Sequence, residues 1–279
     1  MSTAQARRRT ARAITYVVLV AGLILWLFPF VWMLLGSFKK QAELLRFPPT
    51  IWPEDPTGAN YATWFFQLGI GRYFANSVLI AGVTVLGNLV FCAMVGYALA
   101  KLQFWGKRAL FVVVMVMLMV PGIVMFIPLF VLVSRMGLIG TYPGLILPFL
   151  TSPMGVFLMR QFMYAIPDEL LEAARIDGAG ELRIFARVVL PLCGPALATL
   201  GVLTFLGSWN NFLWPLVASQ NQRMFTLPVA LSLNAIGQRG TDHGLFLAGS
   251  VLIIVPILLV FVALQRFVIQ GIATTGLRG

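Results

Sequence analysis

Charged residues are scarce in this chain of 279 residues: they occupy 10% of positions, while 59% are hydrophobic and the mean hydropathy is +0.91. Soluble domains are roughly one quarter charged, so this composition indicates a membrane protein. A chain of this length has room for about six spans of about 20 residues each. The formal net charge is +11. Because cytoplasmic loops of membrane proteins collect Lys and Arg, this excess does not predict nucleic-acid binding.

Side chains for catalytic, metal or redox chemistry are also scarce. The chain has one histidine, His243, and two cysteines, Cys92 and Cys193, none at CxxC or metal-ligand spacing. The sequence therefore predicts no metal site, no catalytic residue and no membrane enzyme, and both cysteines are expected to be packing residues. The phosphate-binding loop GxxxxGK[ST] is missing too, because Gly106-Lys107 lacks the upstream glycine and the following hydroxyl. The chain itself is predicted to bind no cofactor and to hydrolyse no ATP.

Carboxylates do not occur within the long apolar runs. The nine lie at positions 43, 54, 55, 168, 169, 172, 177, 181 and 242. An ion-coupled secondary transporter or a channel is the main alternative class of function. Such carriers usually place an ionisable side chain inside the membrane to bind the coupling ion, so the distribution argues against this alternative.

Six apolar runs predict an all-α polytopic membrane protein with six transmembrane helices. They are Ile14–Gly36, Ser77–Ala100, Leu110–Ser134, Pro143–Met159, Gly194–Val217 and Leu245–Phe267. The fourth is short and contains Pro148 and Pro153, which predicts a tilted or irregular span. The six-span domain is expected to cover 14–268, between an N-terminus of 1–13 and a C-terminal tail of 269–279.

The Lys and Arg distribution predicts the orientation. With the N-terminus inside, 13 of the 20 basic residues lie on the cytoplasmic side and seven outside, as the positive-inside rule requires. Both termini are then cytoplasmic. Arg7, Arg8 and Arg9 before the first run also resemble a signal peptide, but the run is too long and lacks a clear cleavage site. An uncleaved first span is predicted.

The segment Ala165–Leu192 is the most charged part of the chain, with eight Asp, Glu or Arg among 28 residues. Pro167 followed by two acids predicts the start of a helix, and Asp177-Gly178 predicts its end. A second helix is expected to present one apolar face until Pro191 stops or kinks it. That face consists of Leu182, Phe185, Ala186, Val189 and Leu190.

Two interpretations of this segment are open on physical grounds. It is either an amphipathic connector on lipid headgroups, with Arg183 and Arg187 on phosphates, or a docking site for a cytoplasmic protein. Ala173-Ala174 and Gly178–Gly180 have little side chain to bury in lipid, and small residues allow another backbone to approach closely. This favours docking.

The same segment resembles the EAA loop of permease subunits from binding-protein-dependent ABC importers. The matching residues are Glu172, Ala173, Ala174, Gly178, Val188, Leu190 and Pro191, with valine at position 188 where isoleucine is usual. The residues around the loop resemble the carbohydrate-uptake branch. Gly207–Phe212 and Gln265–Val268 resemble the second permease subunit of maltose-type transporters.

The resemblance implies a type I ABC importer permease fold in the cytoplasmic (inner) membrane of a prokaryote. It implies a cytoplasmic coupling helix seated on an ATPase. The coupling residues would be Glu172, Ala173, Ala174, Asp177, Gly178, Ala179 and Pro191. Implied partners are a homologous permease, two ABC ATPase subunits that use ATP and Mg²⁺, an extracytoplasmic solute-binding protein and the lipid bilayer. The cargo would be a sugar or sugar-like solute, and the C-terminal tail matches the family ending only loosely.

Two further regions are candidates for contact with the solute or its binding protein. Trp209, Asn210, Asn211 and Trp214 combine aromatic faces with amides that suit a sugar. Alternatively, the tryptophans are interfacial anchors and the asparagines bond between helices. The outer loops, about Ser37–Phe74 and Ala218–Gly244, would receive the binding protein. The apolar middle of the second loop, Phe225–Leu231, is expected to lie at the membrane surface.

Overall fold

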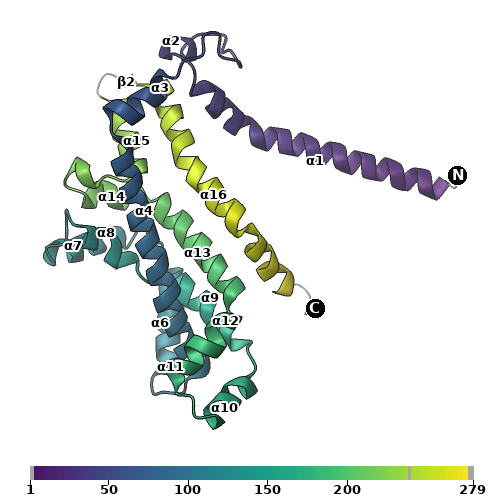
Figure 1. The fold of residues 1–279 in the computed structure, drawn as a ribbon, viewed down its shortest axis with the longest axis vertical. Coiled ribbons are helices and arrows are strands. Elements are labelled where there is room, and N and C mark those ends of the chain that lie inside the picture. The colour runs from purple at the N-terminus through teal and green to yellow at the C-terminus, as the bar shows by residue number, and fades with distance from the viewer. Residues whose placement is uncertain (1–2, 238–239, 276–279) are drawn as a thin grey trace. The chain divides into compact units, whose positions relative to one another are not determined.

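The computed structural model describes residues 3–237 and 240–275, which are almost entirely helical, as predicted. The chain folds as two compact units. Unit 1 comprises the described residues of 1–69 and 231–254, and unit 2 those of 70–230 and 255–275. The elements, coloured along the chain in Figure 1, are described for each unit separately.

Unit 1 contains one long N-terminal helix, the first part of the long C-terminal helix, and several short elements. Its elements are α1 (Thr3–Gly36), α2 (Gln41–Leu44), α3 (Ala59–Ala62), the π-helix η1 (Thr63–Gln67), the hairpin β1 (Ile236–Gly237) and β2 (Gly240–Thr241), the end of α15 (Leu227–Ala235) and the first part of α16 (His243–Thr275). Trp64 is buried and donates from Nε1 to the Leu245 carbonyl at 2.9 Å. Lys39 is buried and donates to Thr50 Oγ1 at 2.8 Å. The predicted long first loop is therefore an ordered structure.

Unit 2 holds the remaining helices. They are α4 (Ile70–Gly87), η2 (Asn88–Cys92), α5 (Ala93–Lys101), α6 (Lys107–Met119), α7 (Phe126–Arg135), α8 (Tyr142–Ile146), η3 (Leu147–Phe149), α9 (Pro153–Tyr164), α10 (Asp168–Ile176), α11 (Glu181–Ile184), η4 (Phe185–Val189), α12 (Leu190–Leu192), α13 (Gly194–Trp209), α14 (Leu213–Ala218) and η5 (Gln222–Met224), together with the start of α15 and the end of α16. The π-helices η2 and η4 each insert a wide turn into a longer helix.

Among the described residues, three helices are long and apolar enough to cross a membrane: Ile14–Gly36, Ile70–Lys101 and His243–Ala263. Two bent pairs, Tyr142–Phe149 with Pro153–Tyr164 and Glu181–Leu192 with Gly194–Trp209, raise the number to five if each is one span. The second predicted run therefore begins seven residues earlier than expected, at Ile70.

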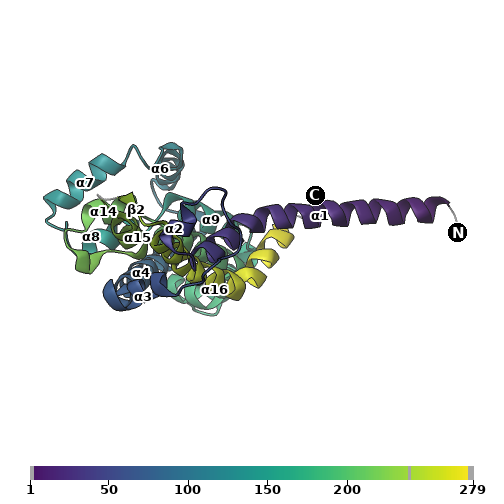
Figure 2. The same cartoon turned by 90° about the horizontal axis from the view of Figure 1, so that it is seen from above.

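The third predicted span, Leu110–Ser134, is not one continuous helix. It is divided into α6 and α7, and Figures 1 and 2 show the two helices running in different directions. Val120, which directly follows α6, has an extended backbone (φ −80°, ψ 120°) and precedes Pro121-Gly122. Proline disfavours the helical conformation in the residue before it, which explains the break. The prediction of a single helix here was wrong.

The fourth and fifth predicted spans are bent. Ser152 caps α9 by accepting from the Gly155 N–H at 3.1 Å, and the break before α9 bends the pair by 41°. This agrees with the irregular span predicted from its prolines. The helix that contains Pro191 bends by 81° before α13, at Cys193 rather than at the proline. α13 then ends at Trp209, eight residues before the predicted end.

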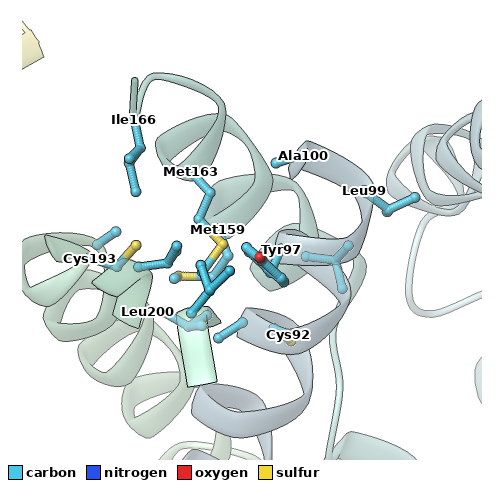
Figure 3. Close-up of a cluster of buried hydrophobic side chains, with 14 of the residues drawn as sticks. Cys92, Tyr97, Leu99, Ala100, Met159, Met163, Ile166, Cys193 and Leu200 are labelled. Atoms are coloured by element: carbon cyan, nitrogen blue, oxygen red, sulfur yellow. The ribbon is translucent and has the colours of Figure 1, made fainter. Parts of the chain in front are cut away.

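The core of unit 2 forms where α5, α9 and α13 meet (Figure 3). Cys92, Met159, Met163 and Cys193 are fully buried there, so both cysteines are packing residues as predicted. Gly96 sets the distance between α5 and α9, because a Cβ at this position would lie 2.8 Å from Met159 Cβ. Close helix approach through small residues is common in membrane proteins.

The last predicted outer loop is also more structured than expected. Its apolar middle begins α15, in which Leu227, Val229 and Ala230 are buried. Ser77 Oγ accepts from the Leu227 N–H at 2.9 Å. These side chains therefore pack inside the protein and do not face lipid, while the location of the segment at the level of the membrane surface stays a prediction.

Candidate functional site

The predicted helix–turn–helix is present, and we call α10, the Gly178 turn and α11 the elbow. Gly178 has a φ of +79°, the left-handed conformation that favours glycine. The Ala179 N–H bonds to the Ala174 carbonyl and the Gly178 N–H to the Arg175 carbonyl, each at 3.0 Å. This pair of bonds is a Schellman motif, which satisfies carbonyls at the end of α10. The end of the first helix is therefore where Asp177-Gly178 predicted it.

Polar contacts hold the elbow to α5. Across the turn, Arg175 Nε lies 2.8 Å from Glu181 Oε1. The Tyr97 hydroxyl donates to Glu181 Oε2 at 2.6 Å. At the start of α10, Lys101 Nζ donates to Asp168 Oδ1 at 2.6 Å. This hydrogen bond from the lysine, with its charge, lowers the pKa of the Asp168 carboxyl. The elbow is thus connected to the end of one long helix at two points.

The buried face of the elbow differs from the predicted one. Leu171, Ile184 and Val189 are buried in the core, whereas Leu182 is 73% exposed and Ala186 is also exposed. Val189 is the last residue of the π-helix η4, five positions after Ile184. Of the predicted face, Val189 is buried and Phe185 and Leu190 pack against the core. The prediction was wrong for Leu182 and Ala186 and missed Ile184, because a π-helical turn brings residues i and i+5 to the same side.

The exposed residues form what we call the elbow surface: Glu172, Ala173, Ile176, Asp177, Gly178 and Leu182. Ile176 is 86% exposed, so the surface combines two bare aliphatic side chains with two carboxylates. Ala174 and Ala179 are half-buried and pack against the core beneath. Pro191 lies in α12, shortly before the 81° bend, and belongs to the connection with α13.

A second feature of unit 2 is a cavity of about 370 Å³. It is lined by residues from α4, η2, α8, η3, α9, α13 and α14 and the turns that join them, including Thr84, Asn88, Ser152, Gly155, Thr204, Ser208, Asn211 and Trp214. Of the four residues predicted to contact the solute, Asn211 and Trp214 line this cavity. Trp214 is held in place by a 3.1 Å bond from Nε1 to the Gly144 carbonyl.

The other two predicted contact residues have local structural roles. Trp209 is 1% exposed and stacks on Phe205, with ring centroids 5.3 Å apart. Asn210 follows α13 and donates from Nδ2 to the Leu206 carbonyl at 3.0 Å, a bond within its own helix end. Neither is among the residues that line the cavity.

The polar side of the cavity was not predicted from the sequence. Ser152 Oγ donates to Asn88 Oδ1 at 2.8 Å, and Asn88 Nδ2 donates to the Phe149 carbonyl at 2.7 Å. Thr84 Oγ1 is buried and has no hydrogen-bond partner among the described residues. The available signal was the presence of Thr84 and Asn88, four residues apart, inside a long apolar run.

Residues 90–274 match the model of a family described as "Binding-protein-dependent transport system inner membrane component". The chain belongs to this family. This permease is 42% identical over 255 residues to the arabinooligosaccharides transport system permease protein AraQ of Halalkalibacterium halodurans, over 90% of this chain and 91% of the relative. It is 34% identical over 268 residues to the diacetylchitobiose uptake system permease protein NgcG of Streptomyces coelicolor, over 95% and 88% of the two chains.

The permease also resembles a chain of the solved bacterial ABC transporter involved in the import of the acidic polysaccharide alginate. The TM-score is 0.83 at 23% identity, over 96% of this chain and 99% of that chain, which shows the fold. The protein is therefore a multi-pass, non-catalytic permease subunit of a binding-protein-dependent ABC importer in the inner membrane. This confirms the predicted family, and it excludes the ion-coupled carrier or channel as its class.

Proposed function

We propose that this permease moves a sugar or sugar-like solute and is driven by ATP through the elbow. The support for the cargo is that the named relatives are permeases for arabinooligosaccharides and diacetylchitobiose. ATP and Mg²⁺ would be used by two ATPase subunits, while a homologous permease would complete the translocation path. A solute-binding protein would deliver the cargo to the outer loops in unit 1 and around 218–244.

In this proposal the chain crosses the membrane six times. The crossings are α1, α4–α5, α6 with α7, α8–α9, α13 with α14, and α16. Each half of the broken third crossing is short, so the two helices would span the bilayer together. With both termini cytoplasmic, the elbow would lie inside, and the 13-to-seven distribution of basic residues supports this orientation. Residues 269–275 continue α16, and 276–279 lie outside the described residues.

The elbow surface would dock on the ATPase. Its exposed small and aliphatic residues are the main support for the proposal. Its small and exposed residues Ala173 and Gly178 permit close approach, and Ile176 supplies apolar area. The Tyr97–Glu181 and Lys101–Asp168 contacts would transmit movement of the docked elbow to α5. The proposed coupling residues are Glu172, Ala173, Ala174, Asp177, Gly178, Ala179 and Pro191. Of these, Ala174 and Ala179 pack beneath the elbow surface, and Pro191 lies in the connection with α13.

Of the four predicted solute contacts, only Asn211 and Trp214 are proposed to line the solute path, because Trp209 and Asn210 are not among the residues that line the cavity. The indole of Trp214 suits the CH groups of a sugar ring. The Asn211 amide and the Thr84 hydroxyl, which has no partner among the described residues, suit its OH groups. The cavity would be one part of the path, completed by the second permease.

The replacement of Gly178 by leucine tests the docking proposal. It forces a bulky side chain into the elbow surface at φ +79°, and we expect the ATPase subunits to dissociate or transport to stop. Gly137→Leu is the matched control, because Gly137 also has a positive φ (+69°) and open space around it. The assays are co-purification of the ATPase and uptake by the reconstituted importer. If the Gly178 variant keeps both assembly and transport, the coupling assignment is wrong.

A further inference from the structure

Next to the elbow, unit 2 has a large open cavity of about 1230 Å³ that the proposed transport cycle does not use. It lies between the segment Leu99–Phe111, the end of α9 and the start of α10. Four cationic side chains line it: Lys101, Lys107, Arg108 and Arg160. We call this cavity the basic groove.

Arg160 is held in a fixed position in the groove. Its guanidinium carbon lies 3.8 Å from the centroid of the Phe111 ring. Arg160 Nη1 lies 3.3 Å from Gln161 Oε1, whereas Nε is buried and has no partner among the described residues. Stacked arginines present a planar set of donors that matches phosphate oxygens. Because Nε is enclosed by protein atoms, a phosphate would meet the terminal nitrogens of the guanidinium.

The start of α6 adds further positive potential. The helix is capped by Gly106, at φ +83°, without a side-chain hydrogen bond. The N-terminus of a helix attracts anions through its free N–H groups and dipole. Lys107 Nζ donates to the Leu102 carbonyl at 2.7 Å, which holds a second cationic side chain at this helix start.

Two carboxylates also line the groove, but they do not neutralise it. Asp168 is engaged by Lys101 at 2.6 Å, and Glu169 lies at the same end, at the start of α10. Four cations and two acids leave a formal excess of two positive charges. The positive-inside rule explains the sign of these charges but not the stacking of Arg160 on Phe111 inside the groove.

Exposed aromatic side chains surround the cations. Trp105 is 99% exposed, Tyr164 is 65% exposed and Phe104 is 40% exposed. Such residues are enriched at the depth of lipid headgroups, and basic pockets at that depth on the cytoplasmic side bind anionic headgroups. We propose that the basic groove binds an anionic phospholipid of the cytoplasmic leaflet, with the headgroup phosphate on Arg160, Arg108 and the N-terminus of α6. This inference rests on the orientation proposed above.

The experiment measures lipid binding to the full-length chain by native mass spectrometry in detergent. The probes are palmitoyl-oleoyl phosphatidylglycerol and the zwitterionic phosphatidylcholine with the same chains. We expect preferential binding of phosphatidylglycerol, which Arg108→Gln with Arg160→Gln reduces by about fivefold for each arginine removed. The matched control is Arg183→Gln with Arg187→Gln, which removes two exposed arginines outside the groove and is expected to keep the preference.

Three results would overturn the proposal. These are equal binding of both lipids, an equal loss in both double variants, and displacement of phosphatidylglycerol by millimolar inorganic phosphate or glycerol phosphate. The last result would mean that the groove binds a soluble phosphate instead of a lipid. Because Arg160 is half-buried, Arg108→Gln alone is a second test that leaves the packing intact. No ATPase is present in this assay, so co-purification of the ATPase separately tests the proposed coupling function.

Discussion

The Tyr97 hydroxyl donates a 2.6 Å hydrogen bond to Glu181 Oε2, and this contact joins α5 to the second helix of the elbow. Glu181 also pairs with Arg175 on the first helix. A single carboxylate therefore fixes the angle between the two elbow helices and their position on the core. Side-chain networks of this kind restrict movement because each member orients the next.

Tyr97→Phe should loosen the elbow without emptying the core. A hydrogen bond to a partly exposed charged group contributes about 1 kcal/mol, so we expect a small loss of thermal stability. The larger effect should be on coupling: the reconstituted importer is expected to hydrolyse more ATP per solute transported. Tyr164→Phe serves as the control, because Tyr164 is exposed and outside this network. Equal ATP-to-solute ratios in both variants would refute a coupling role for Tyr97.

The Lys101–Asp168 contact predicts a dependence on pH. The folded-state pKa of Asp168 lies below its ordinary value of 3.8, so the contact stabilises the elbow above that value. This stabilisation should be lost only as the pH falls below 3.8 and through the lowered pKa. Limited proteolysis of the elbow should therefore be constant from about pH 8 to 5 and increase in stronger acid. The hydrogen bonds from Arg175 and Tyr97 lower the pKa of the Glu181 carboxyl too, so Asp168→Asn should reduce the increase in acid without abolishing it; an unchanged profile would contradict the assignment.

Gly96→Ala should destabilise the packing of α5 on α9. The added Cβ would lie 2.8 Å from Met159 Cβ and 2.9 Å from the Arg160 backbone nitrogen, neither of which moves easily. Overpacking of this kind costs about 1–3 kcal/mol, measured as a lower midpoint of thermal unfolding in a fixed detergent. Gly82→Ala in the same apolar stretch is the control, since its Cβ would meet nothing within 4 Å. The packing interpretation fails if both variants unfold at the same temperature.

Thr84→Val tests the cavity as part of the solute path. The hydroxyl has no partner among the described residues, so its removal should leave folding stability unchanged or slightly higher. If the hydroxyl bonds to the solute in transit, the KM for uptake should rise about fivefold, the effect of one lost hydrogen bond. Thr226→Val is a matched control, because Thr226 Oγ1 is also buried without a described partner but does not line the cavity. A KM that is equal in both variants would exclude the role.

Local signals in the sequence predicted local structure well. Asp177-Gly178 correctly predicted the end of α10. The left-handed glycine that ends a helix can be recognised from the adjacent sequence alone. Val120-Pro121 carried an equally local signal for the break between α6 and α7, but the apolar run around it dominated the prediction.

Features that depend on tertiary packing were not predictable in the same way. The π-helical turn of η4 changed which residues of the second elbow helix are buried, and no periodicity in the sequence indicates it. The cavity joins Thr84 to Asn211 and Trp214, which are more than 120 positions apart, so its lining depends on how helices pack. Of the four residues that the sequence offered as solute contacts, Asn211 and Trp214 line it, whereas their polar neighbours were not predicted.

The wide turn at Phe185–Val189 has a consequence for chain length in this permease. An α-helix rotates by about 100° per residue, and a π-turn contains one residue more than the regular turn it replaces. Deletion of one residue there would convert the wide turn into a regular α-helical turn. Residues i and i+4 share a face of an α-helix as i and i+5 do in a π-helix, so Ile184 and Val189 would both stay in the core. A single deletion within Phe185–Val189 should therefore be tolerated, whereas a second deletion would rotate everything that follows by about 100° relative to α10.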